Sequence, residues 1–249
     1  MPFELDLEPA PEEPCPYLPD RAMRVRGFAC AEVPGYAYQD LLDAGFRRSG
    51  LIYYQPMCRD CRACVPLRVP VASFVTSRSQ RRVLRRNRDL SLSWAEPALS
   101  DEKLAIYQRY LEARHDRIMD RGREGVERFL YSSSTDTIEG EYRDATGRLV
   151  GVAICDVTPE ALSSVYFYHE PAEAERSLGT FSALCEITRA RETGRAHYYL
   201  GYWIAACAKM AYKDRFRPCQ TLDGDGVWRT LAELQQDETR EGDEFQSLP

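Results

Sequence analysis

The sequence predicts an α+β fold with a larger domain over residues 90–229 and a smaller, cysteine-containing region over residues 14–89. Three consecutive strand-like runs in the larger domain are flanked by helical patterns, and short helical and strand-like runs also occur in the smaller region. The chain has 249 residues, of which 44% are hydrophobic and 29% are charged. This length and composition fit a globular protein with one large core or two smaller ones.

The two ends of the chain are acidic. Residues 1–13 hold five acids, no base and three prolines, and they predict a disordered tail. Residues 230–249 hold six acids and one arginine and predict a second acidic tail. The whole chain has a formal charge of −6, but the part between the tails has 28 acids and 32 bases, a balance of about +4. Because local charge sets the field that a polyanion meets, the net charge does not exclude a nucleic-acid partner.

The sequence shows neither a membrane segment nor a secretory signal. No run approaches the roughly 18 apolar residues that cross a bilayer, and the first residues lack a basic start and an apolar stretch. Nine cysteines are an odd number, which does not suit a fully paired secreted scaffold, so we expect reduced thiols. We therefore expect no membrane partner and a cytoplasmic location.

The smaller region begins with a proline-rich turn, Cys15-Pro16-Tyr17-Leu18-Pro19, which presents Cys15 rigidly. Residues Tyr36 to Ala44 have helical spacing, and Gly45 is a natural stop for that helix. Leu51 to Gln55 and Cys64 to Val71 predict strands on either side of a cysteine loop.

A basic helix is predicted from Ser77 to Arg88. Ser77 or Ser79 can cap its start, and Val83 and Leu84 are its only apolar anchors, so it should lie on the surface. Its arginines, with no acid among them, are Arg78, Arg81, Arg82, Arg85, Arg86 and Arg88. Such a run suits a phosphate backbone, although a solvated helix face is the simpler interpretation of a charge run.

The larger domain alternates between the two kinds of element. Strands are predicted from apolar and polar alternation, helices from caps and periodicity, and a hairpin turn from Asp144 to Gly147. In order, we predict a strand at Leu90–Ala95, a helix at Ser100–His115, a short helix at Val126–Tyr131, strands at Thr137–Arg143, Leu149–Val157 and Ala161–Tyr168, a helix at Thr180–Glu192, a strand at Tyr198–Gly201, a helix at 203–213 and a closing strand pair within Phe216–Trp228. This order resembles the GNAT-type acyltransferase fold.

Cys58, Cys61 and Cys64 have a spacing that lets three thiolates converge on one metal ion. Cys15 is the first candidate for a fourth ligand, and Cys30 is the second. Zinc and an iron–sulfur cluster both use such spacings, so the sequence leaves the two open. A metal here would more simply staple the smaller region than take part in a reaction.

Two other segments of the larger domain could bind a ligand. Gly179 lies at a strand-to-helix turn, where a helix N-terminus offers N–H groups to a phosphate, although a packing glycine explains it equally well. Tyr199 and Tyr202 could stack on unpaired bases and Lys213 could neutralise a phosphate, unless these aromatics belong to a strand core. With three histidines and no HExxH or Walker motif, the chain does not resemble a metalloprotease or a P-loop enzyme.

Several motifs, taken together and in order, resemble one family over about residues 14 to 228. They are Cys15-Pro-Tyr-Leu-Pro, Gly45-Phe-Arg-Arg-Ser-Gly50, Tyr54-Gln-Pro56, the Cys58–Cys64 run, Ser77-Arg-Ser-Gln-Arg-Arg82, Ser177-Leu-Gly-Thr180, Tyr199-Leu-Gly-Tyr-Trp203 and Lys209-Met-x-Tyr-Lys213. The chain resembles the bacterial aspartate/glutamate leucyltransferases, which are relatives of the eukaryotic arginyl-tRNA–protein transferases.

The resemblance implies an enzyme that moves leucine from leucyl-tRNA to the N-terminal Asp or Glu of a protein and so creates an N-degron, with no cofactor required and no DNA partner. Transfer of arginine, acetyl transfer from coenzyme A and a non-catalytic, metal-containing RNA-binding module remain alternatives. We expect Arg47 or Arg48 to read the acceptor carboxylate. We expect the 3′ end of the tRNA to be held by Gly179, Tyr199, Tyr202 and Lys213. We expect its acceptor stem to be held by Arg78, Arg81, Arg82, Arg85 and Arg86. Tyr166 or His115 is expected to relay a proton.

Overall fold

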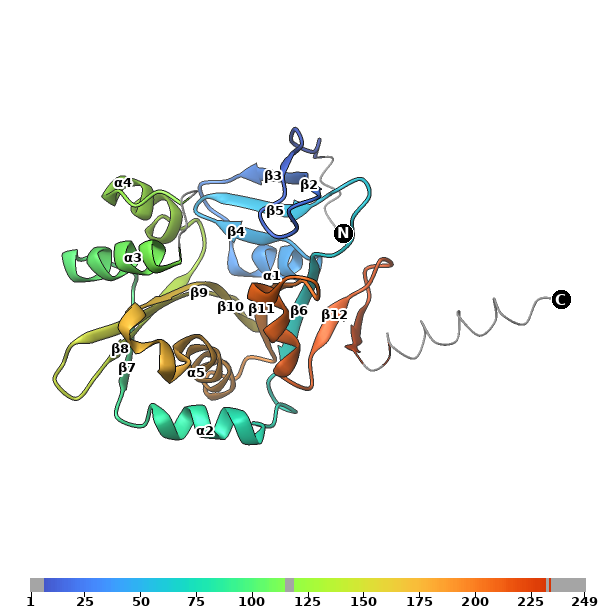
Figure 1. Ribbon diagram of the computed structural model, residues 1–249. Coiled ribbons are helices and arrows are strands. Elements are labelled where there is room, and N and C mark those ends of the chain that lie inside the picture. The colour runs from blue at the N-terminus through green and yellow to red at the C-terminus, as the bar shows by residue number, and fades with distance from the viewer. Residues whose placement is uncertain (1–6, 115–118, 232, 234–249) are drawn as a thin grey trace.

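An eight-stranded mixed sheet forms the centre of the computed structural model, which describes residues 7–114, 119–231 and 233 (Figure 1). Its strand order is β13-β12-β6-β11-β10-β9-β8-β7, and a three-stranded sheet, β3-β5-β4, and a two-stranded ladder, β1-β2, lie beside it. The strands are β1 (Glu13–Pro14), β2 (Ala22–Met23), β3 (Val25–Ala29), β4 (Arg47–Ser49), β5 (Ile52–Pro56), β6 (Val65–Pro70), β7 (Ser91–Ala95), β8 (Thr137–Arg143), β9 (Leu149–Val157), β10 (Ala161–His169), β11 (His197–Trp203), β12 (Gln220–Leu222) and β13 (Trp228–Thr230).

The helices cover both faces of the large sheet. They are α1 (Gly35–Asp43), α2 (Arg78–Arg86), α3 (Asp101–Ala113), α4 (Arg123–Val126), α5 (Leu178–Glu192) and α6 (Ala208–Ala211), with single turns η1 (Glu127–Tyr131), η2 (Pro171–Arg176) and η3 (Tyr212–Arg215). In Figure 1, α5 and α2 lie on one side of the sheet, and α3 and the small sheet lie on the other.

Strand β9 shows why the core has two layers. It is buried from Leu149 to Asp156, and its side chains alternate between the faces. Ala153 and Cys155 pack with Leu184 and the rest of α5, whereas Val152 and Ile154 pack with α3. A third cluster joins α1 and the small sheet to the large one.

The basic helix begins as the sequence predicts. The Ser77 side chain accepts from the Gln80 backbone N–H, and the Gln80 side chain accepts from the Ser77 N–H, which completes a capping box. Val83 and Leu84 are half-buried against the core that α5 shares with the sheet. The arginines of α2 are therefore left exposed.

Strands β10 and β11 lie parallel but pair over only three residues, from Ala161↔His197 to Ser163↔Tyr199. Beyond Ser163 each strand has a bulge, at Ser164/Tyr166 against β9 and at Tyr199/Gly201 against β6. The two strands diverge there, which opens the middle of the sheet. This split, together with the mixed strand order, confirms the predicted α+β, GNAT-like fold.

The structure corrects two expectations. The predicted helix at 203–213 is instead the end of β11, followed by α6 and η3, because Tyr202 and Trp203 pair with Pro66 and Val65 of β6. Residues 7–13, expected to be disordered, include Ala10, whose N–H donates to the Val25 carbonyl, and Glu13, which pairs with Met23. Strand β6 lies in the large sheet, so residues from before position 90 contribute to the larger domain.

Candidate active site

A cavity of about 1060 Å³ opens where β10 and β11 diverge. Strand β4 of the small sheet reaches its floor, the N-terminus of α5 forms one wall, and α6 and η3 form another. Of the residues that the sequence singles out, the cavity brings together Arg47, Arg48, Tyr166, Gly179, Tyr202 and Lys213.

Arg47 binds strand β10 at the point where β11 diverges from it. Its Nη1 donates to Ser163 Oγ at 3.0 Å, and its Nη2 donates to the Ser164 carbonyl oxygen. That carbonyl lies just past the last β10–β11 pair, so the guanidinium supplies a donor where the neighbouring strand has moved away. Arg47 is 8% exposed, and within the described part of the chain it forms no ion pair with an acid. It therefore presents a buried positive charge to the cavity.

Lys213 lies next to Arg47. Its Nζ donates to the Tyr202 carbonyl oxygen at 2.8 Å. Burial, and then the Arg47 charge, lower the pKa of Lys213 to about 7. Gly201 makes room for Lys213, because a Cβ at this position would lie 3.3 Å from the Lys213 Nζ, and the Gly201 φ of 86° also favours glycine. Two adjacent cations without an acidic partner form a site for an anion.

Arg48 has a different environment, although it also borders the cavity. Its guanidinium donates to both carboxylate oxygens of Asp156, at 2.8 and 2.6 Å, and to the Gly50 carbonyl at 2.7 Å. Both side chains of the pair have no exposed surface. Burial opposes the charge of Arg48, but Asp156 outweighs it and raises the pKa of the guanidinium. Of the two predicted carboxylate readers, only Arg47 has its charge unpaired.

The N-terminus of α5 faces the cavity. Ser177 adopts a left-handed conformation (φ 57°, ψ 47°), and its carbonyl accepts from the N–H groups of Thr180 and Phe181. The N–H groups of Leu178 and Gly179 precede the first intrahelical bond and carry the positive end of a 15-residue helix dipole. A Cβ on Gly179 would meet nothing within 4 Å, so the protein itself does not require glycine here.

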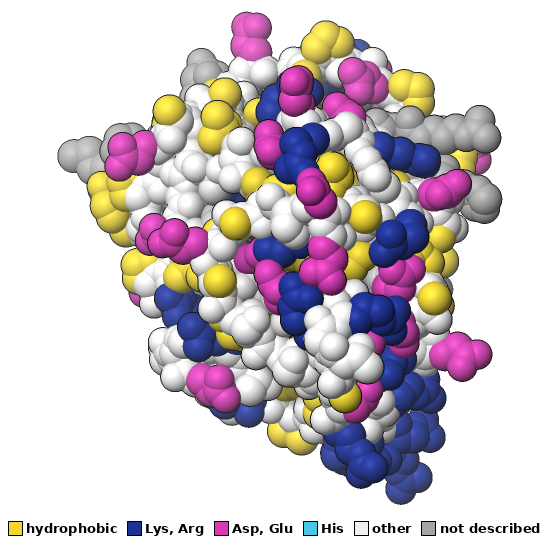
Figure 2. Space-filling model, turned by 90° about the vertical axis from the view of Figure 1, so that its left-hand side faces the viewer, with side chains coloured by type: hydrophobic (Ala, Val, Ile, Leu, Met, Phe, Trp, Pro, Cys, Tyr) yellow, Lys and Arg dark blue, Asp and Glu magenta, His cyan; other side chains and the backbone are white. Residues whose placement is uncertain are grey.

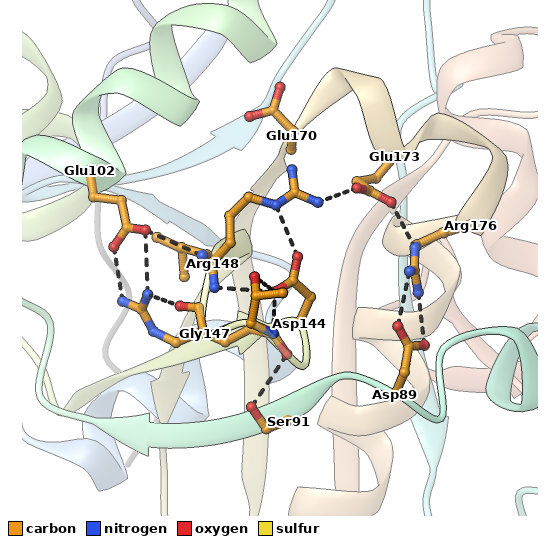
Figure 3. Close-up of polar contacts among 12 residues, drawn as sticks. Asp89, Ser91, Glu102, Asp144, Gly147, Arg148, Glu170, Glu173 and Arg176 are labelled. Carbon is orange, nitrogen blue, oxygen red and sulfur yellow. Dashed lines mark hydrogen bonds and ion pairs between the residues drawn. The ribbon is translucent and has the colours of Figure 1, made fainter.

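A network of ion pairs holds the turn that leads into α5 (Figure 3). Arg176 donates to both oxygens of Asp89 at 2.9 Å and to Glu173 at 2.7 Å. Arg148, from the β8–β9 turn, donates to Asp144 at 2.9 Å and also to Glu173. Exposed pairs of this kind contribute about 1 kcal/mol or less each. Their effect is to fix the position of η2, and thereby the start of α5.

The basic helix α2 adjoins the same turn. The Asn87 side chain donates to the Arg176 carbonyl at 2.9 Å, and Arg86 donates to the Glu175 carbonyl. Figure 2 shows Lys and Arg side chains crowded at the lower end of the molecule, the end at which α2 lies in Figure 1. The exposed arginines of this helix are Arg78, Arg81, Arg82, Arg85 and Arg86. A polyanion bound along α2 would reach the cavity at η2.

Of the predicted aromatic residues, Tyr166 and Tyr202 line the cavity and Tyr199 does not. Tyr166 lines the cavity, with its hydroxyl 3.4 Å from the Met119 Sδ, and Tyr202 lines it with its hydroxyl on the Gly45 carbonyl at 2.9 Å. Tyr199 is 2% exposed and packs with α1, and its hydroxyl donates to Asp43 at 2.5 Å. Successive strand residues point to opposite faces, so Tyr199 points away from Tyr198, and it is not among the residues that line the cavity, contrary to its predicted role.

His115, the other predicted proton relay, lies outside the described residues, so the structure does not place it.

The cysteine loop does not fit the predicted metal. Among residues 7–114, 119–231 and 233, no three His, Cys, Asp or Glu side chains form a group that could hold a metal ion. The Cys58 Sγ instead accepts from the Arg24 N–H at 3.4 Å, and burial followed by the neighbouring thiols raises the pKa of Cys64 to about 12. Cys15, Cys58, Cys61 and Cys64 form no disulfide, and because the described residues hold no such ligand group, a zinc or iron–sulfur site at these four cysteines is not supported.

Comparison with known proteins identifies the family. A model of the N-terminal part of arginine-tRNA-protein transferases matches residues 13–82, and a model of their C-terminal part matches residues 102–223. The chain belongs to the arginine-tRNA-protein transferase family.

Curated relatives of this transferase include an aspartate/glutamate leucyltransferase of Pseudomonas putida (strain W619), 42% identical over 220 residues, which are 87% of this chain and 93% of the relative. An aspartate/glutamate leucyltransferase of Chromobacterium violaceum is 40% identical over 223 residues, 88% of this chain and 91% of the relative.

One solved structure is similar to the transferase in fold only. It is the C-terminal domain of a protein described as a lysylphosphatidylglycerol synthetase from Agrobacterium fabrum, 15% identical with a TM-score of 0.50. The match covers 82% of this chain and 65% of that one, which is less than two thirds of its length. Among the described residues of the transferase, no helix is long and apolar enough to cross a membrane.

The polar residues of the cavity that were not predicted from the sequence include Ser164, Glu186 and Tyr198. Glu186 could have been noticed, because it is an acid at a helix position flanked by Leu184 and Ile187 of the core. The split of β10 from β11, which exposes Ser164, had no signal in the sequence.

Proposed function

We propose that this protein is an aminoacyltransferase that joins leucine from leucyl-tRNA to the N-terminal Asp or Glu of acceptor proteins. The observation that carries the proposal is the unpaired cation pair, Arg47 and Lys213, in the cavity of an acyltransferase fold. Acceptors that begin with Asp or Glu bring a carboxylate to such a site, and the named relatives act on these two residues. The product is an N-degron, and the reaction belongs in the cytoplasm, where charged tRNA is found.

The reaction makes modest chemical demands. An aminoacyl ester is already activated, so the acceptor amine can attack its carbonyl carbon without a covalent enzyme intermediate. The C–N bond forms, the ester C–O bond breaks, and the ribose oxygen of the tRNA takes a proton. Holding the two substrates in line can account for roughly 7–11 kcal/mol of the barrier. The carboxylate on Arg47 and Lys213 would fix one substrate, and the tRNA end on the α5 N-terminus would fix the other.

In this proposal, positively charged groups of the protein bind the phosphates of the tRNA. The free N–H groups at Leu178 and Gly179 suit a phosphate of the 3′ end, and Tyr202 offers an aromatic wall beside Lys213. The acceptor stem would continue along the arginines of α2, which adjoin η2. No metal or cofactor enters this scheme.

Charge reversal on α2 should weaken tRNA binding without touching the cavity. Arg81→Glu with Arg85→Glu removes two phosphate contacts, so the slope of log binding constant against log salt should fall by about two. Filter binding of leucyl-tRNA over a salt series measures it. The matched control reverses Arg59 and Arg128, which are 70% and 73% exposed in the β5–β6 loop and in η1. Equal losses in both double variants would contradict a specific role for α2.

Acceptor binding should depend on the charge of Lys213. Its pKa of about 7 means that the free site carries both cations below pH 7 and loses one above it. Affinity for a Glu-starting peptide, relative to a Gln-starting one, should therefore fall roughly five- to tenfold from pH 6 to pH 8. Calorimetric titration measures both peptides, whose α-amines titrate alike. In Lys213→Met, the ratio of the affinity for the Glu-starting peptide to that for the Gln-starting peptide should be low and independent of pH. If this ratio still changed with pH, a group other than Lys213 would be responsible.

The proposed function is tested by the choice of acceptor. Purified protein, leucyl-tRNA carrying labelled leucine and a Glu-starting peptide should give labelled peptide, whereas the isosteric Gln-starting peptide should react at least about 100-fold more slowly, since it leaves the cations unpaired. Equal rates with both peptides would remove Arg47 and Lys213 as the carboxylate site. Absence of label in either peptide would remove the transfer itself.

A further inference from the structure

A buried carboxylate at the cavity is left without a role by the scheme above. Glu186, in α5, is 1% exposed and lines the cavity. Its Oε1 accepts from Ser182 Oγ at 2.6 Å and its Oε2 accepts from the Tyr198 hydroxyl at 2.7 Å. No ion pair is found for Glu186 in the part of the chain that the structure describes, and its partners are these two hydroxyls and the Cys155 thiol rather than a cation. A charge this deep without a counter-ion is costly, which calls for a functional explanation.

A chain of hydroxyls connects this carboxylate to the carboxylate reader. The Tyr198 hydroxyl donates to Glu186, and the Ser164 side chain lies beside Tyr198 in the lining of the cavity. Ser164 is half-buried at the bulge where β10 leaves β11, and its carbonyl is held by Arg47. The order is therefore Ser164, Tyr198, Glu186, from a half-buried residue to two buried ones.

The position of Ser164 matters for the acceptor. In an N-terminal Asp or Glu, the side-chain carboxylate and the α-nitrogen belong to the same residue and lie only a few bonds apart. If the carboxylate binds Arg47, the α-nitrogen falls within reach of the residue that Arg47 holds, which is Ser164. At neutral pH this nitrogen is largely an ammonium ion, with a typical pKa of about 8, and it cannot attack until it loses a proton.

We propose that Ser164, Tyr198 and Glu186 form a proton relay that deprotonates the α-ammonium of the acceptor. The ammonium gives a proton to Ser164 Oγ, Ser164 passes its own proton to the Tyr198 hydroxyl, and Tyr198 passes its own to Glu186. The ammonium becomes an amine and the carboxylate becomes a carboxylic acid, with no other change. The amine then attacks the ester, its second proton goes to the leaving ribose oxygen, and Glu186 returns its proton to water. This relay rests on the proposed transfer reaction.

The groups around Glu186 suit a relay. The titratable side chains that face it are Tyr142 of β8, Cys155 of β9, Tyr198 of β11, Cys185 of α5 and Tyr212 of η3. Burial raises the pKa of each, and the Glu186 charge adds to the effect, so all five stay neutral near pH 7. The cationic side chains that line the same cavity are Arg47, Lys213, Arg114, Lys209 and Arg48, of which Arg48 is paired with Asp156. Tyr198 therefore conducts a proton without holding a charge, and Glu186 is the only one of these groups that can store it.

The test is the pH profile of Glu186→Gln. Single-turnover transfer of labelled leucine, with saturating Glu-starting peptide, should be about 100-fold slower than wild type at pH 6.5. By pH 8.5 the acceptor amine is mostly free, so the deficit should shrink to threefold or less. Tyr198→Phe and Ser164→Ala should show the same pattern, and Ser164→Ala alters only a half-buried side chain if the other two variants fold poorly.

Ser182→Ala is the matched control. It removes the Ser182 hydrogen bond to Glu186 and leaves the Tyr198 contact, so its rate relative to wild type should be the same at every pH. If the transfer rates of Glu186→Gln and Ser164→Ala, relative to wild type, did not change with pH, the relay would be overturned and the transfer reaction would stand. Absence of transfer by the wild-type protein would overturn both.

Discussion

Replacing Arg47 with alanine is expected to lower kcat/KM for a Glu-starting peptide by about 10²–10³-fold. Removing one partner of a buried, hydrogen-bonded charge contact costs about 2–5 kcal/mol, and each 1.4 kcal/mol is a factor of ten. The loss should appear with Asp- and Glu-starting peptides alike and be small for a Gln-starting peptide, which has no carboxylate to pair. Steady-state transfer of labelled leucine to the three peptides measures the effect.

A lysine at position 47 separates charge from geometry. Arg47→Lys keeps the charge but loses the fork that reaches Ser163 and Ser164 together, so we expect only partial recovery relative to alanine. Arg48→Lys serves as the comparison, because Arg48 is occupied by Asp156 and should affect stability more than acceptor choice. An Arg47→Ala protein that still favours Glu over Gln as strongly as wild type would contradict the assignment.

Replacing Asp156 with alanine is expected to destabilise the fold by about 3–5 kcal/mol, since it leaves the fully buried Arg48 charge without a partner. The Tyr38 hydroxyl and the Thr137 hydroxyl, each 2.9 Å from this carboxylate, lose their acceptor as well. Urea unfolding of the variant measures the change.

A double replacement tests the reason for that loss. Arg48→Met with Asp156→Leu removes both charges and fills similar volume, so it should lose less stability than Asp156→Ala alone. A double variant that is less stable than the single one would indicate that hydrogen bonds to Asp156, rather than the unpaired Arg48, dominate the cost.

Much of the fold could be predicted from local pattern. The Ser77 cap of α2, the three strands β8 to β10 and the start of α5 all follow from periodicity and capping residues, which act over a few neighbours. The helix predicted at 203–213 begins only at Ala208, because the pairing of Tyr202 and Trp203 with β6 is a long-range contact that local propensity does not contain. The place of β6 in the large sheet is long-range for the same reason.

The candidate site was partly predictable. Arg47 and Lys213 stood out by residue type and by the family resemblance, but the difference between Arg47 and Arg48 depends on Asp156, which lies 108 residues from Arg48 in the chain. Tyr199 and Tyr198 are neighbours in sequence and lie on opposite faces of the sheet, so only the register of β11 shows which of them lines the cavity. Glu186 carried no motif, and its place in the cavity follows from the packing of α5.

The most direct test of the account is the identity of the transferred residue. Total tRNA, charged with labelled leucine in one reaction and labelled arginine in another, would be offered to the purified protein with a Glu-starting peptide. The account predicts label in the peptide from leucine and at most a trace from arginine. Arginine in the peptide, or no label from either donor when the tRNA is demonstrably charged, would contradict it.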